Sequence, residues 1–391
     1  MKIAINAKKT LLAAALFCSA LALSFPLDFG GSIANFTRVK GNNFSNLKLD
    51  QVNDLLAWIK VPLNKDGSSY FAVQALYEFE HDAFVEKTYN RVDINLAKYV
   101  GAWNVAGSPL TLSAGRFFYT DLSGLVMKQN CDGVNVSVEF PRVVVSAYAG
   151  FTGLLNSGTV KILNHKNDPY EYKTDKVYQV CERYVVASVG ASVPNLFSTQ
   201  TLSGQFLAAV KTSGKSFNRF YATLDMTGPI YKTIYYDAST TLGLQSFDGG
   251  SFEATNLTRA EVKWFAPFKD LTVGAGAVYA SGGKDGKNAF TGFTKIDACF
   301  SMKEPQYTSL FKAYASASIK PLPFLLARSG AGLVFNFAKD SGGFQGFEWN
   351  VGADYQIVSD ACVGASFQQY IDKDDSDASK VQISLNASLS F

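Results

Sequence analysis

The clearest pattern in this chain is the strict alternation of apolar and polar residues at its C-terminal end. Every second residue from Val381 to Phe391 is apolar, and the five residues that alternate with them, from Gln382 to Ser390, are polar. A period of two places the apolar side chains on one face of a β-strand and the polar ones on the other. We therefore expect a final strand with one apolar and one wetted face, ending on an aromatic residue.

Similar stretches of about ten residues, separated by clusters of Gly, Pro, Asn, Asp and Lys, recur along the chain, which is the spacing of barrel strands. Two connections fit less well, because residues 100–109 are long for a turn and residues 212–216 are short for a loop. Eighteen strands are predicted, and sixteen remain the alternative. The predicted strands cover residues 28–39, 51–62, 68–80, 90–99, 110–119, 134–140, 142–152, 180–193, 200–211, 217–226, 231–244, 257–266, 271–281, 306–319, 324–339, 345–357, 361–370 and 379–391.

The connections between these strands alternate in length, as they do in bacterial barrels with short periplasmic turns and longer outer loops. The predicted turns are residues 64–67, 141, 227–229, 267–270 and 320–323. The predicted outer loops include residues 153–175, 245–255, 282–305 and 371–377. The predicted fold class is therefore all-β, a transmembrane antiparallel β-barrel. A soluble β-sandwich has the same alternation, but eighteen strands would make an unusually large one.

Charged residues identify the face of each strand that turns toward the lumen. A charge facing lipid at the bilayer midplane costs about 2 to 4 kcal/mol, so the charged parity must face inward. The basic and acidic residues on that parity are equal in number, which predicts a wall without strong ion selectivity. The basic residues are Arg91, Arg219, Arg259, Lys263 and Lys312, and the acidic ones are Glu78, Glu80, Asp93, Asp225 and Glu261.

The N-terminal residues have the composition of an export signal. Three lysines precede an apolar run, and Ala20-Leu21-Ala22 provides the small residues of a cleavage site. We expect residues 1–22 to be a signal peptide and residues 23–391 to be a single barrel domain. The whole chain has 36 basic and 33 acidic residues, and removing the signal leaves 33 of each. A neutral mature chain does not predict nucleic-acid binding.

The reactive residues of the chain form no recognisable catalytic or metal-binding motif. Cys131, Cys181, Cys299 and Cys362 are far apart and do not have zinc-ligand spacing. They permit three disulfide pairings, among which Cys131 with Cys181 would join two loops. The chain has two histidines and no HExxH or GxSxG motif. We therefore expect no enzyme activity and no cofactor.

Several short segments resemble bacterial porins. They are the terminal Phe391, the run GRFFYTD at residues 115–121, GLV at 124–126 and CDG at 131–133. The chain end is similar to the aromatic signature that the barrel-assembly machinery recognises. With both termini in the periplasm, residues 121–133 are the third outer loop, which in general porins folds into the lumen and forms the constriction.

The resemblance implies candidate residues for the constriction and the pore wall. Fixed charges in a constriction act strongly on a solute because their surroundings have a low dielectric constant. Arg116 is an exception to the pattern, because it shares the parity of Leu110 and Leu112; either a bulge reverses the phase or the side chain snorkels at the rim. The constriction candidates are Asp121, Lys128 and Asp132 from the loop and Arg91, Arg219 and Arg259 from the wall. The lumen-lining candidates are Glu78, Asp93, Asp225, Glu261, Lys263 and Lys312, and the assembly signal is Phe391.

The resemblance implies an outer-membrane porin through which small hydrophilic solutes diffuse passively. Its expected partners are outer-membrane lipid, the barrel-assembly machinery and two further copies in a homotrimer. One alternative is a hydrophobic-substrate transporter of the fatty-acid type, which would carry an N-terminal plug, whereas residues 29–39 have the pattern of a strand. The other is a surface adhesin or structural barrel, for which the Lys- and Tyr-rich loop at residues 161–176 offers a binding surface.

Overall fold

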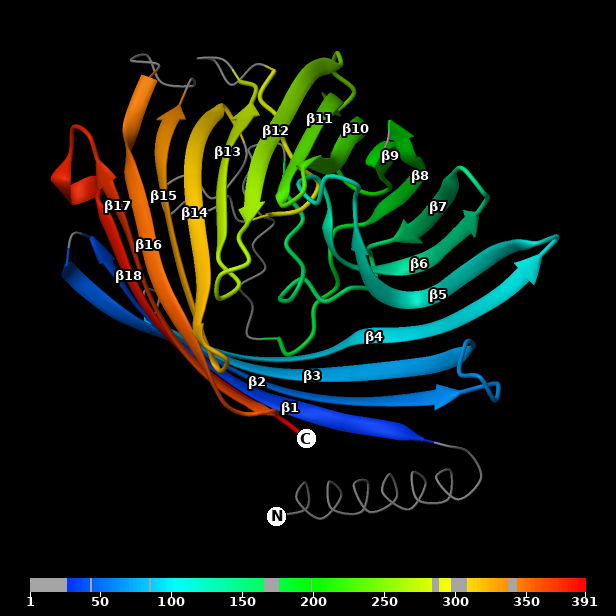
Figure 1. Cartoon of the computed structure of the whole chain (residues 1–391), viewed down its shortest axis with the longest axis horizontal. Helices are drawn as coiled ribbons and strands as arrows, with labels where there is room; N and C mark the ends of the chain where they lie inside the picture. The colour runs from blue at the N-terminus through cyan, green and yellow to red at the C-terminus, as the bar shows by residue number, and fades with distance from the viewer. Residues whose placement is uncertain are drawn as a thin grey trace.

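The described residues of the chain form a closed barrel of eighteen antiparallel strands (Figure 1). The computed structural model describes residues 27–42, 44–83, 86–164, 176–197, 199–282, 288–296, 308–336 and 343–391. The predicted signal peptide and Cys299 lie outside these residues. The strands are β1 (Asp28–Asn42), β2 (Ser45–Pro62), β3 (Tyr70–Asp82), β4 (Lys87–Val105), β5 (Ser108–Thr120), β6 (Lys128–Glu139), β7 (Val144–Phe151), β8 (Tyr184–Phe197), β9 (Gln200–Lys211), β10 (Phe217–Tyr231), β11 (Ile234–Phe247), β12 (Glu253–Phe265), β13 (Thr272–Ala280), β14 (Leu310–Leu322), β15 (Leu325–Asn336), β16 (Gly343–Val358), β17 (Ala361–Asp372) and β18 (Lys380–Ser390).

The barrel closes between the first and the last strand. β1 pairs with β18 in antiparallel register, with Ile33 opposite Leu389. The amide of Gly31 donates to the carbonyl of Phe391 at 2.8 Å, and the amide of Phe391 donates back at 3.0 Å. This pairing confirms the eighteen-strand prediction and excludes the sixteen-strand alternative. A short 3₁₀ helix, η1 (Ser376–Ala378), precedes β18.

The turn between β4 and β5 is much shorter than predicted. β4 continues to Val105 and β5 begins at Ser108, so the connection is only Ala106-Gly107. Both residues have positive φ angles, 51° and 84°, which is the backbone of a type I′ hairpin turn. The first of the two exceptions in the predicted connections is therefore removed, whereas residues 212–216 still form a short connection between β9 and β10.

The outer surface of the barrel is apolar, as the alternation predicts. On β18, the residues Ile383, Leu385 and Leu389 are exposed on one face, and the polar residues between Gln382 and Asn386 are partly covered. Val381 differs from the prediction: it is only 1% exposed, at the start of β18 between Gly41 and Gln369. Exposed apolar residues of the same outward parity on other strands include Tyr77, Val92, Leu224 and Val262.

The buried core lies inside the ring of strands, where three connections meet. They are loop 3 (residues 121–127), loop 4 (residues 152–183) and loop 7 (residues 281–309), which join β5 to β6, β7 to β8 and β13 to β14. Among the described parts of these loops, the amide of Phe293 donates to the carbonyl of Val126 at 2.8 Å, and that of Leu163 donates to Phe293 at 3.0 Å. Figure 1 shows the described parts of these loops within the barrel. No helix among the described residues is long and apolar enough to cross a membrane.

Candidate functional site in the barrel lumen

Arg219 on β10 joins loops 4 and 7 to the wall. Its side chain is completely buried, and Nη1 donates to the carbonyl oxygens of Leu163 at 3.1 Å and Gly292 at 2.9 Å. The guanidinium carbon lies 4.4 Å from the ring centre of Phe217 and 4.8 Å from that of Phe293. A guanidinium can stack on aromatic rings and at the same time donate hydrogen bonds in its own plane. The side chain of Arg219 does both, so the protein encloses this cation. Arg219 was predicted to face the pore, and it does point inward, but it holds the loops instead of meeting water.

Two neighbouring side chains hold loop 7 in the same way. The hydroxyl of Tyr221 on β10 donates to the carbonyl of Thr291 at 2.6 Å, and Nε2 of Gln245 on β11 donates to the same oxygen at 2.9 Å. Both side chains are buried, and each gains a partner for a polar group that would otherwise be costly to bury. The wall formed by β10 and β11 therefore positions loop 7.

Asp121 shapes loop 3. Its Oδ1 accepts from the amides of Val126 at 3.0 Å and Met127 at 2.7 Å, and Oδ2 accepts from the amide and the hydroxyl of Ser123 at 2.9 and 2.6 Å. Burial of the carboxyl raises the pKa of Asp121 above its usual value, although these donors act in the opposite direction. The oxygens of Asp121 are thus occupied within the loop.

Loop 3 is shorter than predicted, and this changes the position of two constriction candidates. The ladder between β5 and β6 continues to the pair Thr120 and Lys128, so Lys128 and Asp132 belong to β6 and not to the loop. Both lie on the parity of Val134, which faces outward. The short motif CDG at residues 131–133 did not indicate that β6 begins before it. Strand pairing determines where the loop ends, and local composition does not.

The six constriction candidates are not in contact with one another. Arg91 pairs with Glu78 and with Glu80, the latter at 2.6 Å, and Arg259 pairs with Asp237 at 2.8 Å. Asp132 pairs with Arg116 on the outward parity. Asp121 binds groups of loop 3, and Arg219 binds carbonyl groups of loops 4 and 7. Each of these five residues therefore has its own partners elsewhere in the barrel. Their role in a constriction stays a prediction.

The lumen-lining candidates all lie on the inward parity of their strands, and most are paired. Lys263 lies 2.9 Å from Glu261, and Asp93 lies 3.2 Å from Arg116. Lys312 on β14 pairs with Glu348 on β16, and both are buried. Sequence reasoning missed Glu348 because a strand separates the partners. Gly332 on β15 lies opposite Glu348 in the register, and its missing side chain leaves room for Lys312. The other candidates on this parity are Glu78 and Asp225.

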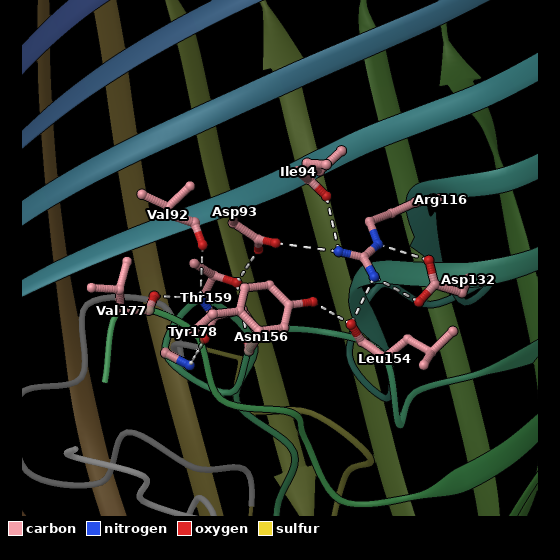
Figure 2. A network of polar contacts seen from close by, with 11 residues as sticks. Val92, Asp93, Ile94, Arg116, Asp132, Leu154, Asn156, Thr159, Val177 and Tyr178 are labelled. Atoms are coloured by element: carbon pink, nitrogen blue, oxygen red, sulfur yellow. Dashed lines mark hydrogen bonds and ion pairs between the residues drawn. The ribbon is translucent and has the colours of Figure 1, made fainter. Parts of the chain in front are cut away.

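Arg116 lies in a seam between β4 and β5 (Figure 2). Its Nε and Nη2 donate to the two oxygens of Asp132 at 2.7 and 2.9 Å, and Nη1 donates to the carbonyl of Ile94 at 3.0 Å. Nη1 also lies 3.2 Å from Asp93, which is on the inward parity, and Nη2 donates to the carbonyl of Leu154 in loop 4 at 2.8 Å. No bulge reverses the phase of β5 at Arg116, and the side chain does not snorkel at the rim. It lies where the wall is interrupted, and there it reaches groups on β4, β6 and loop 4.

Gly115 marks the point of this interruption. The last pair between β4 and β5 is Ala97 with Arg116, although both strands continue toward the loop end of the barrel. Gly115 has φ 114°, and a Cβ there would lie 2.2 Å from the carbonyl oxygen of Ala97. Only glycine fits this conformation and this close approach. β5 therefore turns away from β4 at Gly115.

A polar hollow of about 420 Å³ lies in the lumen beside loop 3. Gln205 on β9 joins the loop to the wall: its Oε1 accepts from the amide of Leu122 at 2.8 Å, and its Nε2 donates to the hydroxyl of Tyr119 at 3.0 Å. Lys98 on β4 is the basic residue of the lining and has no ion pair among the described residues. The small polar residues of the lining are Ser113, Thr120, Asn135, Ser137, Ser146 and Ser192. Such a surface offers hydrogen bonds to a hydrophilic solute.

The described cysteines are unpaired. Cys131 on β6 and Cys181 in loop 4 are buried and free, so they are not joined by the disulfide that their spacing permitted. Burial raises the pKa of the Cys181 thiol to about 12, which keeps it protonated and unreactive near neutral pH. Cys362 on β17 is free and partly exposed.

Comparison with known proteins shows a fold shared with solved structures. No protein-family profile and no curated protein sequence match this chain. Among solved structures, the outer membrane protein OpdK from Pseudomonas aeruginosa is similar, with 13% identity and a TM-score of 0.60 over 93% of this chain and 99% of that one. OpdQ from the same organism has 14% identity and a TM-score of 0.60, again over 93% and 99%. OccK5 (OpdH), also from this organism, has 11% identity and a TM-score of 0.60 over 93% and 98%. These similarities show that the chain has the barrel fold of these proteins.

Proposed function

We propose that this protein is an outer-membrane channel for the passive diffusion of small hydrophilic solutes. The observation that carries the proposal is a closed barrel with an apolar outer face and, inside it, a hollow lined by hydroxyl and amide groups. Each strand pairs with both of its neighbours around the ring, so the barrel can span a membrane without helices. The short turns then lie in the periplasm and loops 3, 4 and 7 enter the lumen from outside.

The charges of the wall support a channel of weak ion selectivity. Arg91, Arg259, Lys263 and Lys312 each lie beside a carboxylate, so their fields are largely cancelled within the wall. Lys98 beside loop 3 is the basic residue from which we expect a modest preference for anions. Solutes that form hydrogen bonds with serine, asparagine and glutamine side chains suit this lining.

The two alternatives have less support. A transporter of the fatty-acid type would carry an N-terminal plug, whereas residues 28–42 form β1 in the wall and close the barrel with β18. A surface adhesin would not require a polar hollow within the lumen. The loop at residues 161–176 was the predicted binding surface of an adhesin. Of this loop, the structure describes residues 161–164 and residue 176.

Planar-bilayer conductance of the refolded protein tests the channel. Ohmic steps that scale with salt concentration are expected, and a barrel that inserts without conducting would contradict the proposal. Deleting residues 123–126 is expected to change the step size if loop 3 borders the pore, and it leaves β6 intact because that strand begins at Lys128. Cross-linking in native membranes tests the homotrimer.

A further inference from the structure

The barrel wall has an interruption in its loop-end half between β4 and β5. The ladder that joins these strands ends at Ala97 and Arg116. Beyond this pair, β4 extends to Lys87 and β5 extends to Thr120 without pairing with each other. Unpaired strand edges are not tolerated in hydrocarbon, because each unsatisfied amide or carbonyl group is costly there. The edge of β4 therefore needs other partners.

Loop 4 and Arg116 provide these partners. The amide of Val92 on β4 donates to the carbonyl of Val177 in loop 4 at 3.2 Å, and Nδ2 of Asn156 donates to the carbonyl of Val92 at 3.1 Å. Nη1 of Arg116 donates a hydrogen bond to the carbonyl of Ile94 at 3.0 Å. Figure 2 shows these contacts along one strand. These contacts occupy the edge of β4 at Val92 and Ile94, which an added strand of a partner protein would otherwise use.

The seam leaves a hollow of about 490 Å³ on the outward side of the wall. Ile94, which is 49% exposed, lies on the same face of β4 as Val92, and Asp132 lies on the same face of β6 as the exposed Val134. Leu154 of loop 4 is 58% exposed at the same place. The lining is completed by Ala97, Gly115, Arg116, Gly133 and Tyr178. A volume of this size is typical of sites that hold a small-molecule ligand.

The polar groups of the hollow are already satisfied by the protein. Arg116 faces the carboxylates of Asp132 and Asp93, so its charge is neutralised and does not select an anion. The hydroxyl of Tyr178 donates to the carbonyl of Leu154. What remains accessible is mainly hydrocarbon surface on the side of the barrel that meets the membrane.

We propose that this hollow binds the hydrocarbon chain of a membrane lipid. The proposal rests on the outer-membrane location of the proposed function, because the lipid chains are the apolar molecules that surround the wall there. An acyl chain covers Ile94, Ala97 and Leu154 and completes the apolar surface where the two strands part. It thereby shields the Arg116–Asp132 pair from water.

A tryptophan reporter tests the site in the full-length protein. The four native tryptophans are replaced by phenylalanine, and Leu154→Trp is compared with Val185→Trp, an outward position on β8 that is 48% exposed. The detergent-solubilised protein is titrated with a phospholipid that carries brominated chains, which quench a tryptophan they touch. We expect saturable quenching of Leu154→Trp at a severalfold lower lipid fraction than that of Val185→Trp.

A second substitution fills the hollow. Adding Ala97→Phe to the reporter is expected to make the quenching of Leu154→Trp follow the control curve, and Ala97→Leu serves if the larger side chain prevents assembly. Identical curves for the two reporters, or an unchanged curve after filling, would overturn the proposal. Conductance of the same variants is measured separately, so a silent barrel that retains saturable quenching would contradict only the channel.

Discussion

Arg116 and Asp132 face each other across β5 and β6, with Nε 2.7 Å from Oδ1 and Nη2 2.9 Å from Oδ2. This is the bidentate geometry in which a guanidinium binds a carboxylate most strongly. The pair lies on the outward parity of both strands, where charges are normally excluded. It is accommodated because the guanidinium also reaches Asp93, Ile94 and Leu154 across the seam.

Replacing Arg116 with methionine is expected to destabilise the barrel by about 3 kcal/mol, because it leaves the poorly exposed Asp132 and Asp93 without a counter-charge. Urea unfolding in lipid vesicles measures this change. The matched control is Arg328→Met, whose partner is Asp354 and whose side chain is about half exposed. Solvent screens that pair, so we expect a loss of roughly 0.5 kcal/mol. Equal losses for the two variants would contradict the central role of Arg116 in the seam.

Gly115 provides a second test of the seam. Gly115→Ala forces a side chain into a positive-φ conformation and against the carbonyl of Ala97, so a loss of at least about 3 kcal/mol is expected. Gly204→Ala on β9 is the control, because a Cβ there has only one neighbour, at 3.9 Å. The two variants are compared by the fraction that migrates as folded barrel in unheated gels. Full assembly of Gly115→Ala would show that β5 can turn away from β4 without a glycine at position 115.

The strands were predictable because a membrane barrel imposes the same period of two on each of them. β9 begins and ends where the sequence placed it, at residues 200 and 211. The β4–β5 turn was misjudged because Ala106 in a type I′ turn is an unusual residue for positive φ. Neighbouring strands fixed the register, and the sequence of one strand does not contain that information.

The interior was much less predictable. The inward direction of Arg219 followed from its parity, but its partners Leu163 and Gly292 come from loops whose paths no local pattern defines. Arg116 was recognised as an exception without its cause, because the interruption of the wall depends on the pairing of β4 with β5. Long-range contacts therefore determined each of these sites.

Arg219→Leu is expected to increase the conductance of a single channel. The substitution removes both hydrogen bonds that hold Leu163 and Gly292 to the wall, so loops 4 and 7 lose an attachment inside the lumen. Arg259→Leu removes a wall cation of similar size whose partner is Asp237 on the adjacent strand, and it serves as the control. Both are recorded in planar bilayers at the same salt concentration. A conductance that changes equally in both variants would argue against a specific attachment by Arg219.

Lys98→Gln is expected to shift the selectivity of the channel toward cations. Lys98 lines the hollow beside loop 3, and a fixed charge close to the path of an ion acts strongly where little water intervenes. The reversal potential across a salt gradient reports this shift. Lys232→Gln, at an exposed turn between β10 and β11, is the control and should leave the potential unchanged. An unaltered potential in Lys98→Gln would place the ion path away from this hollow.

Phe391 contributes a backbone and an aromatic ring to the barrel end, and one substitution separates their effects. Its backbone closes the barrel through two hydrogen bonds with Gly31, while its ring is 70% exposed on the outside. Phe391→Ala keeps the hydrogen bonds and removes the ring. If the ring is the assembly signal, the amount of folded barrel in cell membranes falls, whereas refolding of the purified protein in detergent is unchanged. Phe197→Ala, an exposed aromatic residue at the end of β8, should affect neither measurement. An equal loss in cells and in detergent would show that the ring stabilises the barrel and does not serve as a signal.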